Sequence, residues 1–74
     1  MAMLRLETAT RWYLCAAQES LIGWELWRAW GGKRSPTGGT MVEPAVDKEH
    51  AELLLARVLK MRLAHGYRPV AASG

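Results

Sequence analysis

The chain of 74 residues has little cysteine and no long apolar run, and each shortage argues against a class of protein. Its single cysteine, Cys15, cannot form a disulfide within the chain, whereas secreted domains of this size are usually held by several. No stretch approaches the roughly 20 apolar residues that a membrane-spanning helix needs. Charged residues interrupt the N-terminal segment before it resembles a signal peptide. We therefore expect a cytoplasmic protein that does not associate with membranes.

Residue sets suited to catalysis or metal binding are also missing. The two histidines, His50 and His65, would lie about 22 Å apart along one predicted helix. Cys15 has no second cysteine with which to build a zinc site. The glycine-rich segment lacks the Gly-Lys-Ser/Thr ending of a phosphate-binding P-loop, because Arg34, Ser35 and Pro36 follow its lysine. We expect no enzymatic activity, no metal, no cofactor and no small-molecule substrate.

Tryptophan and positive charge are what the chain does have. It contains four Trp, two Tyr and no Phe, and its formal net charge is +3. A chain of this length forms one domain at most and buries a thin core. The moderate positive charge is compatible with an anionic partner but does not require one.

Two runs of residues predict a β-hairpin. Residues 11–18 combine an aromatic pair with small apolar residues, which favours a strand. After the break at Gly23, residues 24–30 alternate between two faces. One face carries Trp24, Leu26, Arg28 and Trp30. We expect Trp24 and Trp27 in the core, and Trp30 fits the core and the surface equally well.

A basic loop and a third strand follow. Residues 31–39 contain four glycines and a proline together with Lys33 and Arg34, a composition that rules out a regular element. Residues 40–43 are long enough for a short strand, which we expect to stop at Pro44.

The clearest element is a helix from about Asp47 to His65. Asp47 is a good N-cap, and Gly66 stands where a left-handed residue often ends a helix. Six apolar residues share one face at helical spacing, namely Ala51, Leu54, Leu55, Val58, Leu59 and Met61. Arg62 falls inside this apolar arc. Either its stem packs while its charged head reaches water, or it holds an anion or a loop at the rim of the sheet.

These elements predict an α+β fold, in which a small curved antiparallel β-sheet carries one C-terminal amphipathic helix on one face. We expect a single domain over residues 4–70. Residues after Arg68 are expected to fray, and residues 71–74 to form a flexible tail.

A set of motifs in a fixed order runs through the chain from about Arg5 to Arg68. It comprises Arg11-Trp12-Tyr13, Leu21-Ile22-Gly23-Trp24, Leu26, Arg28, Trp30-Gly31, the glycine-rich loop, Val42-Glu43-Pro44 and a helix ending in Arg62 and Gly66-Tyr67. This set resembles the WGR domain. That small domain is found in poly(ADP-ribose) polymerases that respond to DNA damage and in bacterial proteins, either alone or fused to other domains.

The resemblance implies a module that contacts DNA near strand ends. In that family the motif tryptophan and the arginine after the motif glycine lie on the DNA-contacting side. By position these residues are Trp30 and Gly32 here, so the chain departs from the pattern at residue 32. Arg34 is the candidate to supply the missing guanidinium group.

We therefore predict a non-catalytic module that binds nucleic acid, with DNA as the expected partner. The predicted binding residues are Arg28, Trp30, Gly31, Lys33, Arg34 and Arg62. The alternative is a protein-interaction or self-association module that uses exposed tryptophan surface, because a sheet covered on one face leaves the other open. Salt separates the two, since phosphate contacts weaken steeply as salt rises.

Overall fold

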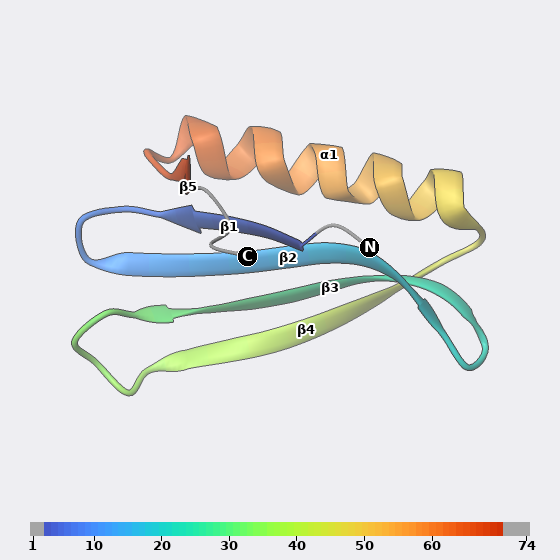
Figure 1. Cartoon of the computed structure of the whole chain (residues 1–74), viewed down its shortest axis with the longest axis horizontal. Coiled ribbons are helices and arrows are strands. Elements are labelled where there is room, and N and C mark those ends of the chain that lie inside the picture. The colour runs from blue at the N-terminus through green and yellow to red at the C-terminus, as the bar shows by residue number, and fades with distance from the viewer. Residues whose placement is uncertain (1–2, 71–74) are drawn as a thin grey trace.

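The computed structural model describes residues 3–70 and contains five strands and one helix (Figure 1). In chain order these are β1 (Met3–Glu7), β2 (Arg11–Ser20), β3 (Gly23–Gly32), β4 (Gly38–Ala45), α1 (Lys48–Ala64) and β5 (Arg68–Val70). The strands form one antiparallel sheet in the order β4-β3-β2-β1-β5. The α+β fold class predicted from the sequence is thus confirmed.

The centre of the sheet is the predicted hairpin of β2 and β3. The two strands pair along their whole length, from Arg11 with Gly32 to Ser20 with Gly23, and only Leu21 and Ile22 connect them. Gly23 has a φ of +145°, a conformation that side chains disfavour, so glycine suits this tight turn. The alternation of β3 is also confirmed, because Leu26 is buried towards the helix.

Helix α1 lies along one face of the sheet (Figure 1). Asp47 caps its first turn, its Oδ1 accepting from the backbone N–H of His50 at 2.8 Å. At the other end Gly66 has a φ of +89°, and the N–H of Tyr67 donates to the Arg62 carbonyl at 3.1 Å. The predicted caps and helix limits are confirmed. Within residues 3–70, no helix is both long enough and apolar enough to cross a membrane.

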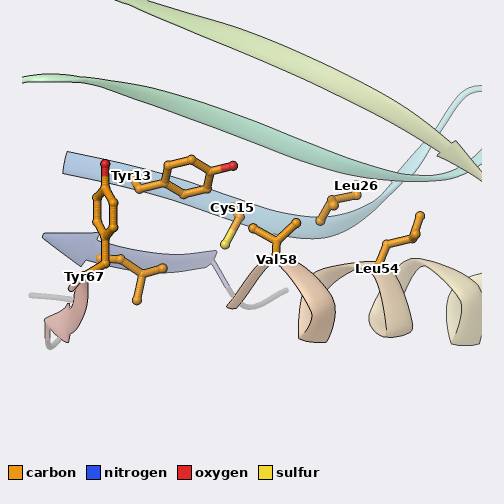
Figure 2. Close-up of a cluster of buried hydrophobic side chains, with 7 residues drawn as sticks. Tyr13, Cys15, Leu26, Leu54, Val58 and Tyr67 are labelled. Atoms are coloured by element: carbon orange, nitrogen blue, oxygen red, sulfur yellow. The ribbon is translucent and has the colours of Figure 1, made fainter. Parts of the chain in front are cut away.

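The core fills the space between α1 and the sheet (Figure 2). The strands contribute side chains from one side of the core and α1 contributes side chains from the other. Tyr67 packs at the end of the core that lies beyond the last turn of α1. The buried members of the core are Leu6, Tyr13, Cys15, Leu26, Leu54, Val58 and Tyr67. In the described part of the chain, the opposite face of the sheet carries no helix.

The two strands at one side of the sheet, β1 and β5, were not predicted from the sequence. Strand β1 pairs with β2. Residues 69 and 70, expected to fray, join Arg68 to form β5 against β1. A strand of three residues has no sequence signature of its own, and it exists because β1 offers a free edge next to the end of the helix. The predicted tail, residues 71–74, lies outside the described residues.

Four smaller expectations were wrong. The glycine-rich loop is shorter than expected, because β3 runs to Gly32 and β4 begins at Gly38. Strand β4 continues past Pro44 to Ala45, which is possible because β4 is an edge strand and pairs with β3 alone among the described strands. Met61 is exposed, since Arg62 rather than Met61 covers the end of the core.

Trp24 and Trp27 lie on opposite sides of the sheet, but both are only half-buried rather than in the core. The Lys48 ammonium at the start of α1 lies 6.0 Å from the Trp24 ring centroid, and Trp27 lies on the face away from α1.

Candidate nucleic-acid interface

A pocket of about 440 Å³ opens on the helix side of the sheet, where α1 ends. Three arginines and three aromatic residues supply most of its walls, and none of the described lining residues is acidic. The lining consists of Arg11, Tyr13, Arg28, Trp30, Met41, Arg62, His65 and Tyr67. We refer to it as the basic pocket.

The aromatic wall of the basic pocket is built from three elements. Tyr13 on β2 stacks on Trp30 of β3, with ring centroids 6.1 Å apart and planes 15° apart. Tyr67, which follows α1, meets Tyr13 edge-on at 5.9 Å. Next to Trp30 on β4 is Gly39, where a Cβ atom would come within 2.9 Å of the indole. The missing side chain at Gly39 therefore leaves room for the indole.

Arg62 enters the pocket from the last turn of α1. Its guanidinium carbon lies 4.8 Å from the Tyr13 ring centroid and 5.8 Å from that of Tyr67. These distances are within the range of cation–π attraction. Its Nε is buried and has no hydrogen-bond partner among residues 3–70. The side chain thus packs on aromatic rings and still has an N–H to donate.

Arg28 approaches from the sheet, beside Trp30 on the helix-facing side of β3. Its Nη2 lies 3.9 Å from Glu43 Oε1, a long ion pair beyond hydrogen-bonding range. Like that of Arg62, its Nε is buried and has no partner in the part of the chain that the structure describes. Both Arg28 and Arg62 line the basic pocket, so an anionic acceptor bound there would lie between two guanidinium groups and be stabilised by their charge.

The glycine-rich loop lies outside the basic pocket. The Nζ of Lys33 forms an ion pair with Glu7 Oε1 at 2.7 Å, and its backbone N–H donates to the Thr10 carbonyl at 2.8 Å. Gly31 lies under the Trp12 ring, on the face of the sheet away from the helix. Arg34 is exposed beside a second hollow of about 400 Å³.

The structure therefore divides the predicted site. Arg28, Trp30 and Arg62 line one pocket, whereas Gly31, Lys33 and Arg34 do not. The pocket is also lined by residues outside the predicted binding set, namely Arg11, Tyr13, Met41, His65 and Tyr67. The sequence signal for Tyr67 is its place in the Gly66-Tyr67 motif, and Gly66 turns the chain back towards the sheet.

Charge is distributed unevenly between the two ends of the molecule. The loops β1–β2 and β3–β4 and the end of α1 gather at one end, and the β2–β3 turn and the start of α1 lie at the other (Figure 1). The basic end carries Arg11, Lys33, Arg34, Arg62 and Arg68 with one acidic residue, Glu7. The acidic end carries Glu19, Glu25, Asp47, Glu49 and Glu52 with one basic residue, Lys48. The basic pocket belongs to the basic end.

Among residues 3–70, two ionisable groups have clearly shifted pKa values. Hydrogen bonds from Lys33 and Arg5 lower the pKa of Glu7, so this carboxylate stays charged and occupies both cations. Burial raises the pKa of the Cys15 thiol, although the charge of Arg28 acts in the opposite direction. Within residues 3–70, no three His, Cys, Asp or Glu residues lie close enough together to hold a metal ion.

No family model, curated protein or solved structure matches this chain.

Proposed function

We propose that the protein is a nucleic-acid-binding module and that the basic pocket receives a backbone phosphate. The observation that carries this proposal is the meeting of three arginines, Arg11, Arg28 and Arg62, around one pocket whose described lining contains no carboxylate. Charge-assisted hydrogen bonds from guanidinium groups to phosphate are among the stronger polar contacts in proteins. DNA is the expected partner, as the resemblance to the WGR domain implies.

The surroundings of the pocket fit the same partner. The ring of Trp30 offers a surface on which a base or sugar could stack, and such contacts are worth about 1–3 kcal/mol each in single-strand binding. Arg11 adds a third arginine to the pocket lining, and Arg34, beside the second hollow, adds positive charge at the same end of the molecule. Lys33 contributes less, because Glu7 already neutralises it.

The test is a fluorescence-anisotropy titration of a short labelled DNA duplex at several salt concentrations. Replacing Arg28 and Arg62 together by Met keeps much of each apolar stem but removes both charges. We expect binding to weaken at least about ten-fold at low salt, and the slope of log K against log salt to fall by about one for each phosphate that the variant no longer binds. The melting temperature serves as the control for folding.

A second pair of variants separates the pocket from the loop. Arg34→Ala should weaken binding only a few-fold, and Lys33→Ala should change it less than Arg34→Ala does. If the loop variants abolish binding while the pocket variants do not, the loop is the site. If the wild-type protein binds neither DNA nor RNA at low salt, the proposal is wrong.

A further inference from the structure

The face of the sheet opposite α1 is apolar at its centre, although none of the described residues covers it. The alternation of the strands places the side chains of Trp12, Leu14, Trp27 and Val42 on this face, with Ala16 and Ala29 between them. We refer to these six residues as the open face. Ala16 and Ala29 are only 2% and 5% exposed, so their larger neighbours already form a continuous layer over them. Such a surface on a small protein commonly marks an interface.

Polar residues border the open face at its two ends, and their charges differ. Towards the basic end lie Arg68, which carries free positive charge, and Glu7, which forms an ion pair with Arg5 at 2.8 Å. Towards the acidic end lies Glu25, whose carboxylate accepts a hydrogen bond from Gln18 at 2.7 Å. An apolar centre with a polar rim is the usual anatomy of a protein interface. The rim is basic on one side and acidic on the other.

We propose that a second copy of this chain covers the open face, turned end for end about a two-fold axis that runs across the strands. This arrangement stacks one apolar sheet face on the other, as in a β-sandwich. It also directs the acidic end of each copy towards the basic end of its partner. A parallel arrangement would bring like charges together, which is unfavourable.

The size of the face limits the area of the interface. With its rim on β1, the open face spans four strands spaced about 4.8 Å apart and about seven residues of about 3.3 Å each, a footprint of roughly 450 Å² per copy. Two copies then bury about 900 Å², which is the size of a weak interface. We expect a reversible dimer with a dissociation constant of about 10–500 µM.

This dimer leaves the proposed nucleic-acid site free. Trp30, Arg28 and Arg62 lie on the helix side of the sheet, and the open face lies on the other side. Dimerisation and nucleic-acid binding can therefore be tested separately, and the failure of one does not imply the failure of the other.

The experiment is sedimentation equilibrium of the full chain over a concentration range that spans the expected dissociation constant. Val42 is 51% exposed at the edge of the open face, so Val42→Lys should not disturb the core. Because a two-fold interface contains each substitution twice, we expect Val42→Lys to weaken the dimer at least about ten-fold. Leu53→Lys is the matched control, since Leu53 is 48% exposed on α1, and it should dimerise like the wild type.

The relative orientation of the copies is tested by Glu25→Lys at low salt. In the end-for-end dimer this substitution places a cation towards the basic end of the partner's β3, which Lys33 and Arg34 follow, so the dimer should weaken several-fold and recover in part as salt rises. An unchanged dimer would rule out the end-for-end arrangement. A wild-type protein that remains monomeric at about 1 mM, or a Val42→Lys dimer as strong as the wild type, would overturn the proposal altogether.

Discussion

Arg62 combines packing and potential binding in one side chain. Its position inside the apolar arc of α1 is explained by the aromatic rings of Tyr13 and Tyr67, which accept a guanidinium group as a neighbour. Replacing Arg62 by lysine would weaken this packing, because an ammonium group is more strongly hydrated than a guanidinium group and lacks its planar set of donors. At the residue scale, the chemistry of the pocket therefore depends on arginine rather than on positive charge alone.

Glu7 gives a test of the charges around the basic loop. Because Lys33 and then Arg5 donate to its carboxylate, an NMR pH titration should give Glu7 a pKa below the ordinary value for glutamate. Because the pKa of Glu7 is lower in the folded protein, the group stabilises the fold at pH values above the pKa that glutamate has in the unfolded chain. This contribution disappears as the pH falls through the lowered value.

Lys33→Met is the control for this titration. It removes the largest cause of the shift and leaves Arg5 in place, so the pKa of Glu7 should rise towards the ordinary value without reaching it. A Glu7 pKa that is the same in both proteins would mean that the ion pair does not form in solution.

At the scale of elements, the helix was the most predictable part of the chain. Its limits depend on Asp47 and Gly66, which act on neighbouring backbone groups and are therefore visible in the sequence. The strands were only partly predictable. The hairpin of β2 and β3 has local signals, whereas β5 is defined by its pairing with β1, at the opposite end of the chain.

The C-terminal end of α1 gives a test at the scale of elements. Gly66 has a φ of +89°, and a Cβ there would meet no atom of the described residues within 4 Å, so any cost of substitution comes from the backbone alone. We expect Gly66→Ala to lower the free energy of unfolding by about 1–2 kcal/mol. Gly66→Asn should cost less, because asparagine tolerates left-handed conformations better. Equal losses in urea denaturation would contradict this explanation.

At the scale of the whole molecule, the core is thin and one strand residue is central to it. Leu26 is fully buried between the sheet and α1 (Figure 2). Leu26→Ala should cost about 2–5 kcal/mol, a large part of the roughly 4–11 kcal/mol expected for a domain of this length. Chemical denaturation followed by tryptophan fluorescence measures the loss. Val46→Ala, at an exposed position, should change the stability by less than about 0.5 kcal/mol.

The sequence by itself determined the fold class, the central hairpin and the limits of the helix, because alternation, turn residues and caps act over a few neighbouring positions. It also singled out Arg28, Trp30 and Arg62. Only the tertiary structure decided that these three share a pocket while Lys33 is neutralised by Glu7, a contact between residues far apart in the chain. The same holds for the open face. Which side of a sheet remains uncovered is settled by where the helix packs, and no single strand encodes that choice.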